Sequence, residues 1–142
     1  MNKKKKVLFV CTGNSCRSQI AEGLLRDLSN AHYEVFSAGS HPSRLHPASV
    51  TVMAEWGIDI SNQTSDNIDE YLDKNIDIVI SVCDNARQAC PTFPGNVTRI
   101  HWSIDDPFHG WSADPIDLEP YRITRQILKE KIQSFIKEKF NK

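Results

Sequence analysis

The sequence has no strong excess of charge of either sign, since 17 Lys and Arg residues face 18 Asp and Glu residues and leave a net charge of −1. Such a chain has no general attraction for nucleic acid or an anionic membrane, so an anion must be captured by a local site. Long apolar runs are absent, as is an N-terminal apolar segment followed by small residues. We therefore expect neither a signal peptide nor a membrane span, and a cytoplasmic protein. The one basic run, Lys3 to Lys6, is typical of a solvated leader.

Cysteine is also scarce, and its four positions lack the Cys-x2-Cys spacing of structural zinc sites. The residues are Cys11, Cys16, Cys83 and Cys90. In a reducing compartment such cysteines are more often redox-active or catalytic than part of a structural disulfide framework. The length of 142 residues predicts a single domain over residues 1–142, large enough to bury a core.

Strand-like and helix-like segments alternate along the chain. Strands are predicted over 7–10, 33–38, 76–82 and 97–101, and helices over 17–29, from Pro47 to a stop at Gly57, and from the capping residues Thr64, Ser65 and Asp66 through Leu72. Residues 103–120 read as an irregular segment, and a final helix carries an apolar face formed by Ile123, Ile127, Leu128, Ile132, Phe135 and Ile136. Short connections between alternating elements predict an α/β fold with an open, doubly wound parallel sheet.

The end of the first strand carries a Cys-x5-Arg loop that opens a helix, at the edge where such sheets place their chemistry. In this arrangement backbone N–H groups, the positive end of the helix dipole and the planar donors of Arg17 converge on a tetrahedral anion. Gly13 lets the backbone curl and Ser18 offers a hydroxyl to the sulfur of Cys11. The same field should lower the pKa of the Cys11 thiol. The alternative is an inert cysteine buried at a strand end.

The long irregular segment offers an acid for the departing oxygen, because Pro107 holds Asp106 in an extended conformation. A carboxyl group in an apolar, anion-rich pocket stays protonated more readily and can act as a general acid. An Asp-Pro pair alone is typical of a turn, whereas its combination with the Cys-x5-Arg loop favours the catalytic interpretation.

These motifs resemble the low-molecular-weight protein tyrosine phosphatase family over nearly the whole chain. The matching segments are Cys11-Thr12-Gly13-Asn14-Ser15-Cys16-Arg17-Ser18, Ser37-Ala38-Gly39, Gly57-Ile58-Asp59-Ile60 and Asp106-Pro107. The resemblance implies an open four-stranded parallel sheet flanked by helices on both faces, with a phosphate-binding loop after the first strand. It also implies the site roles: Cys11 as nucleophile, Arg17 as oxyanion clamp, Ser18 as thiolate partner, Asp106 as general acid, Asn14 as the residue that orders the loop, and an oxyanion cradle made by Thr12, Gly13, Asn14, Ser15, Cys16 and Arg17.

Two features depart from the tyrosine phosphatases. Phe108-His109 stands where they usually carry tyrosines after the Asp-Pro pair, and the segment from Cys83 to Cys90 resembles the cysteine pair of the thioredoxin-coupled arsenate reductases of the same fold. If residues 84–90 are helical, a rise of about 1.5 Å per residue separates this pair by roughly 10.5 Å, beyond the ~7 Å Cα limit of a disulfide. Oxidation must then unwind the segment. The alternative is two unrelated buried thiols.

The sequence thus predicts an arsenate reductase with three active cysteines. Cys11 attacks arsenate, Cys83 attacks Cys11 and releases arsenite, and Cys90 attacks Cys83, so that a Cys11–Cys83 disulfide is followed by a Cys83–Cys90 disulfide for thioredoxin. Cys16 has no required role in the cycle. Phosphate and sulfate are expected competing anions, no cofactor is required, and we expect a monomer without nucleic-acid or membrane partners. A glutaredoxin and glutathione system stays open as reductant; the alternative functions are a phosphatase on phosphotyrosine or small phosphomonoesters, and a thiol redox-sensing or anion-binding module.

Some reductases of the family bind potassium, and the resemblance places oxygen donors for that ion on Asn14, Glu22, Ser37 and Asp66. The alternative, slightly preferred, is that these residues serve loop hydrogen bonding and helix capping.

Overall fold

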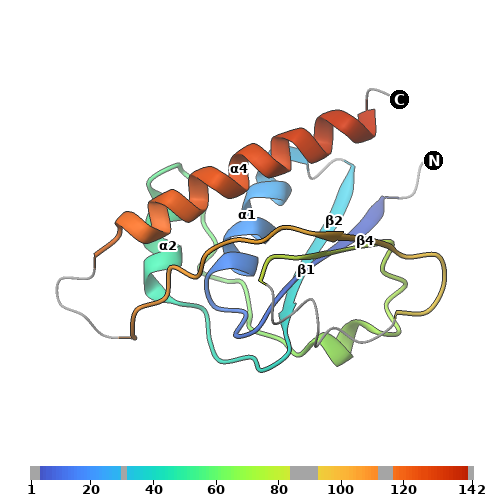
Figure 1. Ribbon diagram of the computed structural model, residues 1–142, viewed down its shortest axis with the longest axis horizontal. Coiled ribbons are helices and arrows are strands. Elements are labelled where there is room, and N and C mark those ends of the chain that lie inside the picture. Colours follow the sequence, from blue (N-terminus) through green and yellow to red (C-terminus); the bar gives the residue numbers. More distant parts are fainter. Residues whose placement is uncertain (1–3, 30–31, 84–92, 112–116, 141–142) are drawn as a thin grey trace.

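The computed structural model describes residues 4–29, 32–83, 93–111 and 117–140 (Figure 1). The strands β1 (Lys5–Cys11), β2 (Tyr33–Gly39), β3 (Ile78–Ser81) and β4 (Thr98–His101) form one parallel sheet in the order β2-β1-β3-β4. In the register of the sheet, Val7 of β1 lies between Val35 and Ile78. The prediction of an open four-stranded parallel sheet is confirmed.

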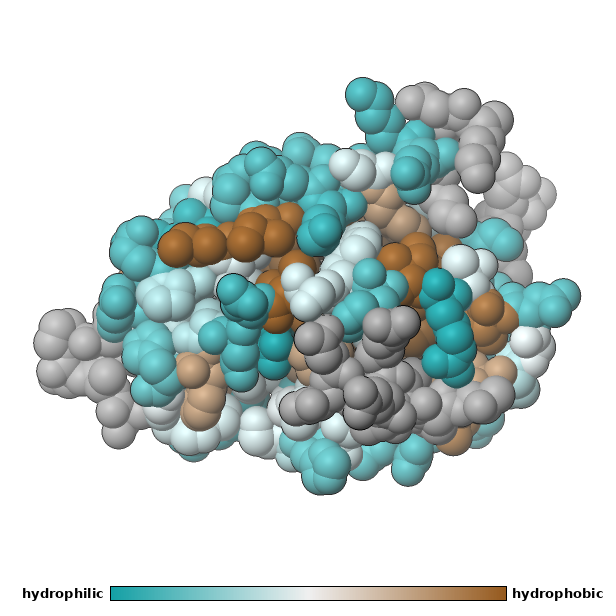
Figure 2. Space-filling model, in the orientation of Figure 1, coloured by the Kyte–Doolittle hydropathy of each residue, from teal (hydrophilic) through white to brown (hydrophobic). Residues whose placement is uncertain are grey.

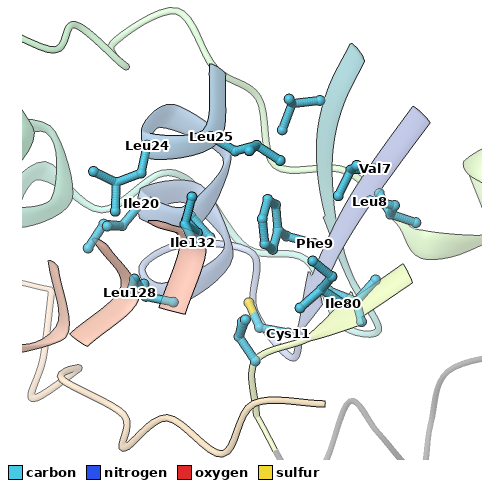
Figure 3. Packing of buried hydrophobic residues seen from close by; sticks show 14 of the residues in the cluster. Val7, Leu8, Phe9, Cys11, Ile20, Leu24, Leu25, Ile80, Leu128 and Ile132 are labelled. Carbon is cyan, nitrogen blue, oxygen red and sulfur yellow. The ribbon is translucent and has the colours of Figure 1, made fainter. Parts of the chain in front are cut away.

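Helices α1 (Arg17–Ser29), α2 (Pro47–Ala54) and α4 (Glu119–Phe140) contact one another and lie together against one face of the sheet. Figure 3 shows the Phe9 side chain of β1 directed toward Leu25 of α1 and Ile132 of α4. All three side chains are fully buried. Burial of one such side chain stabilises the fold by about 1.5–3 kcal/mol, so this central layer is a main source of stability.

On the other face of the sheet, a short 3₁₀-helix, η1 (Ile68–Tyr71), packs against β2. Side chains alternate between the faces of a strand, and Phe36 of β2 therefore points away from its neighbour Val35. The Phe36 ring packs against the ring of Tyr71, with centroids 5.4 Å apart. Helical elements thus flank the sheet on both faces, as expected.

Several helix and strand ends in the structure differ from those predicted. The helix through Leu72 is wrong in kind and in its cap: η1 is capped by Asn67 in a reciprocal pair with Glu70. The cause is that the Asp66 carboxylate already accepts hydrogen bonds from the hydroxyls of Thr64 and Tyr71. The helix that starts at Pro47 ends at Ala54 rather than at the glycine, and the strand predicted over 76–82 narrows to Ile78–Ser81.

The apolar face predicted for the final helix is mostly buried, but two apolar side chains of the helices are exposed. Leu128, Ile132 and Phe135 of α4 lie in the core, whereas Ile123 is 57% exposed and Leu28 of α1 is 41% exposed. Both exposed residues lie near a helix end, where less of the helix is covered by its neighbours.

Hydrophilic and apolar residues are interspersed on the face seen in Figure 2, with apolar groups gathered between α4 and the sheet. A groove there, between β4 and α4, is lined by Ile100, Trp102, Ile127 and Phe135 together with charged residues of α4. In the part of the chain that the structure describes, no helix is both long enough and apolar enough to cross a membrane.

Candidate active site

The segment between β1 and α1 is held in a tight curl by hydrogen bonds to its carbonyl groups. The carbonyls of Cys11, Thr12, Gly13 and Ser15 accept bonds from the backbone N–H groups of Ser40, His41, Ser43 and His46, at 2.8–3.2 Å. In a trans peptide the N–H points opposite to the C=O. Because the carbonyl groups of the loop point outward to these donors, the N–H groups of the same peptides point toward the inside of the loop. Such an arrangement of N–H groups is what a binding site for an anion requires.

Asn14 orders this loop, as expected from the resemblance. Its backbone has φ of 49°, in the left-handed region that Asn adopts more readily than most residues. Its side-chain amide donates to Ser18 at 2.7 Å and to Ser37 at 3.0 Å, while its side-chain carbonyl accepts from the N–H of Asp66 at 2.9 Å. The fully buried side chain thereby joins the loop to α1 and β2 and to the segment before η1.

The Cys11 sulfur is buried and lies among donors. The backbone N–H of Asn14 donates to it at 3.1 Å, and Ser18 Oγ lies 2.8 Å away. Because the Asn14 amide donates to the same Ser18 oxygen, the hydroxyl hydrogen of Ser18 is free to point at the sulfur. The predicted hydroxyl donor is therefore in place.

The predicted lowering of the Cys11 pKa is reversed in this arrangement. Burial raises the pKa of the thiol, and this outweighs the lowering by the side-chain and backbone hydrogen bonds from Ser18 and by the charge of Arg17. Removing a thiolate from water costs more than these donors return. The same holds for the neighbouring Cys16, whose pKa burial also raises, with Ser15 Oγ 3.6 Å from its sulfur.

Arg17 and Asp106 face one another across the site. The guanidinium of Arg17, at the start of α1, donates to the carbonyl of Ile104 at 2.9 Å and lies 3.5 Å from the Asp106 carboxylate. The other Asp106 oxygen accepts from the N–H of Phe108 at 3.0 Å, so its direction is fixed. The apolar pocket expected around this carboxyl is not found, because the Asp106 side chain is 51% exposed and lies beside the Arg17 guanidinium. Its exposure gives it access to an oxygen that leaves toward solvent.

The loop, Arg17 and Asp106 line one cavity of about 250 Å³. Its complete lining is formed by Cys11, Thr12, Gly13, Ser15, Cys16, Arg17, Ser43, Asp106, Phe108 and Trp111. The sequence-predicted residues of the oxyanion site are thus brought together, except that Asn14 supports the loop from behind. Ser43 and Trp111 were missed, because both lie in irregular segments without a local motif.

His46 supports the aromatic side of this cavity and was also missed. Its Nδ1 accepts from the N–H of Ala48 at 3.0 Å, so Nε2 carries the hydrogen and donates to the carbonyl of Gly110 at 2.7 Å. The imidazole stacks on Trp111 at 5.0 Å and meets Phe108 edge-on at 5.7 Å. The position before Pro47 was the available signal, since a residue there caps the helix.

Cys83 lies two residues after the end of β3, which pairs with β1. The N–H of Val82 bonds to the carbonyl of Val10 at 2.9 Å, so the ladder continues to the residue before each cysteine. The Cys83 sulfur is 3.4 Å from the hydroxyl of Thr12, the residue that follows Cys11. The two buried thiols therefore meet at the same edge of the sheet (Figure 3 shows Cys11). Cys90 and the helix predicted over 84–90 lie outside the described residues.

The four residues predicted for potassium come together, but each of them already uses a side-chain oxygen in a hydrogen bond within the protein. Glu22 accepts from Ser37 at 2.5 Å and forms an ion pair with Arg26. The Asn14 carbonyl and the Asp66 carboxylate also accept protein donors. Burial raises the pKa of Glu22, against the lowering by Ser37 and Arg26. With a guanidinium already beside the one buried carboxylate, this arrangement does not fit a potassium ion, and it matches the alternative of loop hydrogen bonding.

The comparisons with known proteins agree with this site. The sequence profile of the low molecular weight phosphotyrosine protein phosphatase family matches residues 6–142. The chain therefore belongs to this family.

Its relatives include proteins that carry a reductase name. An arsenate reductase of Halalkalibacterium halodurans is 41% identical over 93% of this chain and 95% of its own length. A solved structure described as an arsenate reductase in the phosphate binding state is 38% identical, with a TM-score of 0.75 over 94% of this chain and 98% of that one. A thioredoxin-dependent arsenate reductase of Corynebacterium glutamicum is 26% identical, with a TM-score of 0.75 over 96% of this chain and 62% of its own.

Proposed function

We propose that this protein reduces arsenate to arsenite. The observation that carries the proposal is the placement of two buried thiols at one sheet edge, where the Cys83 sulfur lies 3.4 Å from the hydroxyl of Thr12, the residue after Cys11. A phosphatase of this fold needs the nucleophile, the arginine and the acid, but it has no use for a second cysteine there. The relatives named as arsenate reductases support the same conclusion.

In the first step the loop N–H groups and the Arg17 guanidinium hold the arsenate oxygens. Because burial favours the thiol form of Cys11, its proton first passes to an arsenate oxygen. The thiolate then attacks arsenic, a sulfur–arsenic bond forms, and one oxygen leaves as water after Asp106, in its protonated form, donates a proton. The negative charge that builds on the remaining oxygens is met by donors that are already in position, which is the usual source of such rate enhancement.

In the second step Cys83 attacks the sulfur of Cys11. A sulfur–sulfur bond forms and the sulfur–arsenic bond breaks, and its electron pair passes to arsenic. Arsenic(V) is thereby reduced to arsenic(III), and two thiols are oxidised to the Cys11–Cys83 disulfide. The contact between Cys83 and Thr12 keeps the attacking sulfur close to the loop.

The third step restores the nucleophile. Cys90 attacks Cys83 by thiol–disulfide exchange, Cys11 leaves as a thiolate, and the Cys83–Cys90 disulfide passes to thioredoxin. Thioredoxin is the reductant we propose, in line with the Corynebacterium relative. The cytoplasmic location, the monomeric state and the single-domain organisation stay predictions from the sequence.

The test is arsenate-dependent oxidation of NADPH in the presence of thioredoxin and thioredoxin reductase. Wild type should consume NADPH in proportion to the arsenite released, and Cys11→Ser should consume none. Turnover only with glutaredoxin and glutathione would replace the reductant, and no arsenate-dependent consumption with either system would overturn the proposed function.

A phosphatase is the second candidate, and the shape of the cavity favours it. Phe108 and Trp111 form an aromatic lining beside the oxyanion loop that an aryl group can contact, with the Trp111 ring itself held by stacking on His46 and by the guanidinium of Arg44. Because phosphate and arsenate share shape and charge, we expect some hydrolysis of aryl phosphates alongside arsenate reduction. Aryl phosphate hydrolysis that exceeds arsenate reduction in kcat/KM would make the phosphatase the main function.

A further inference from the structure

Arg26, in the last turn of α1, joins three parts of the protein behind the oxyanion loop. One nitrogen of its guanidinium forms the ion pair with Glu22 and donates to the carbonyl of Val35 at 2.8 Å. The other nitrogen donates to the side-chain carbonyl of Gln63 at 2.9 Å. The planar fork thus fixes two side chains at once, which a lysine ammonium does less well.

The first of these side chains leads to the loop through β2. The Glu22 carboxylate accepts from Ser37 Oγ at 2.5 Å, and Ser37 in turn accepts from the side-chain amide of Asn14 at 3.0 Å. The same amide holds Ser18, whose hydroxyl is 2.8 Å from the sulfur of Cys11. A continuous series of hydrogen bonds therefore runs from the guanidinium to the nucleophile.

The second side chain leads to the same residue by another route. Gln63 donates to the side-chain carbonyl of Gln19 at 2.8 Å, and the Gln19 amide donates to the backbone carbonyl of Asn14 at 2.8 Å. Both routes thus end on Asn14, one on its side chain and one on its backbone. Two independent anchors of this kind fix the left-handed conformation that shapes the loop.

We propose that Arg26 is a positioning residue whose guanidinium serves as the built-in cation of the oxyanion loop, so that this chain needs no potassium ion to keep Asn14 in place. The inference rests on the proposed role of the loop in anion binding, and it holds for arsenate and phosphate alike. Without Arg26, the Glu22 carboxylate, 10% exposed, would be left without its paired charge. Only then would a small cation find a ligand there.

The test compares potassium chloride with choline chloride at equal ionic strength, in wild type, Arg26→Ala and Arg26→Lys. Three quantities are measured: Tm, the rate of Cys11 alkylation by iodoacetamide as a function of pH, and kcat/KM for p-nitrophenyl phosphate. The first two need no turnover, so they remain informative if arsenate is not the substrate. Arg122→Ala is the matched control, because Arg122 pairs with Glu55 and Glu119 away from the loop.

For wild type, and likewise for Arg122→Ala, each of the three quantities should be the same in potassium chloride as in choline chloride. Arg26→Ala in choline should lose ~10- to 10²-fold in kcat/KM, as expected when a reacting group is displaced by about 1 Å, and potassium should restore part of that loss together with Tm. The kcat/KM and Tm of Arg26→Lys in choline should lie between those of wild type and those of Arg26→Ala. The double variant Arg26→Ala with Glu22→Gln removes both charges and should fold without any response to potassium. If Arg26→Ala alone is too unstable to measure, this double variant takes its place in the comparison with wild type.

Two results would overturn the proposal. One is a wild type whose Tm and alkylation profile already depend on potassium. The other is an Arg26→Ala variant that folds and matches wild type in choline by all three measurements. If wild type does not reduce arsenate, but its Tm and alkylation profile are independent of potassium, the result counts against the proposed function and not against the role of Arg26.

Discussion

Ser18 has one hydroxyl hydrogen, and the hydrogen bonds around it direct that hydrogen to Cys11. The bond to Ser18 is the largest of the effects that lower the Cys11 pKa, against the burial that raises it. Ser18→Ala should therefore raise the pKa further, and the pH at which iodoacetamide alkylates Cys11 at half its maximal rate should move upward. Ser43→Ala is the control, since its hydroxyl bonds to the carbonyl of Gly13 and not to the sulfur. An unchanged alkylation midpoint in Ser18→Ala would remove this residue from the activation of the thiol.

The role of the Asp106 side chain depends on the oxygen that leaves the substrate. As a general acid it should matter most for a basic leaving group, so Asp106→Asn should slow arsenate reduction and phenyl phosphate hydrolysis by ~10²–10⁴-fold. With p-nitrophenyl phosphate the loss should be smaller, because that leaving group needs little protonation. Asp105→Asn is the matched control, as this neighbour does not line the cavity. Equal losses with both leaving groups would show that Asp106 shapes the cavity without donating a proton.

Contacts within one motif could be predicted from the sequence pattern, whereas the approach of distant partners such as Ser37 and Asp66 was indicated by the resemblance to a known family. Cys11, Asn14 and Ser18 fall within one strand, loop and helix start, so the motif alone indicates their contacts. Arg26 donates a hydrogen bond to Gln63, which lies 37 positions further along the chain, and no local sequence pattern indicates such a pair. The pKa of Cys11 was predicted in the wrong direction because the motif shows the donors but not the depth of burial.

At the scale of elements, the close approach of β2 to the oxyanion loop depends on Gly39. A Cβ atom at this position would lie 2.5 Å from the carbonyl oxygen of Thr12 and 3.0 Å from the backbone nitrogen of Asn14. Both atoms belong to the backbone, so the loop itself would have to move. The motif at the end of β2 therefore acts on the site through space, although it lies far along the chain from Cys11.

Gly39→Ala should accordingly damage the site more than the fold. We expect a loss of about 1–3 kcal/mol in the free energy of unfolding and a loss of ~10²-fold in kcat/KM, measured by denaturant titration and by steady-state kinetics. Gly57→Asn is the control, because Gly57 has φ of 75° and open space around it. A Gly39→Ala variant with wild-type kcat/KM would show that the loop tolerates displacement.

The order of the elements and, except for η1, their type followed from the sequence pattern, whereas their ends did not. η1 illustrates the reason: Asp66 reads as a helix cap, but its carboxylate is taken by the hydroxyls of Thr64 and Tyr71. The cap therefore passes to Asn67. Which of several capping side chains caps the helix is decided by the other hydrogen bonds that each of them makes, and the sequence pattern does not show these bonds.

At the scale of the whole molecule, Glu55 joins α2 to α4 through Arg122 and Arg125. Hydrogen bonds from the two arginines lower the pKa of this carboxyl from 4.5 to about 2. A carboxyl whose pKa is lower in the folded state stabilises the fold above its unfolded pKa, and this contribution disappears as the pH falls through the folded value. The contact therefore stabilises the protein at neutral pH and weakens in acid.

Glu55→Gln should lower Tm at pH 7, and its difference from wild type should shrink as the pH falls from about 4.5 to about 2. Glu119→Gln is the control, because Glu119 pairs with Arg122 within α4 and joins no second helix. Thermal unfolding over this range of pH measures the effect. A Tm difference that stays constant would mean that Glu55 acts through packing rather than through its charge.

The central claim concerns the passage of electrons from two thiols of this chain to arsenic, and one trapping measurement tests it most directly. In Cys90→Ser the third step is blocked, so one equivalent of arsenate should yield one equivalent of arsenite and a protein held as the Cys11–Cys83 disulfide. Peptide mapping by mass spectrometry identifies that bond. A stoichiometric Cys11–Cys83 disulfide is the result we predict, and a Cys90→Ser protein that releases arsenite while Cys11 and Cys83 both remain reduced would contradict the mechanism.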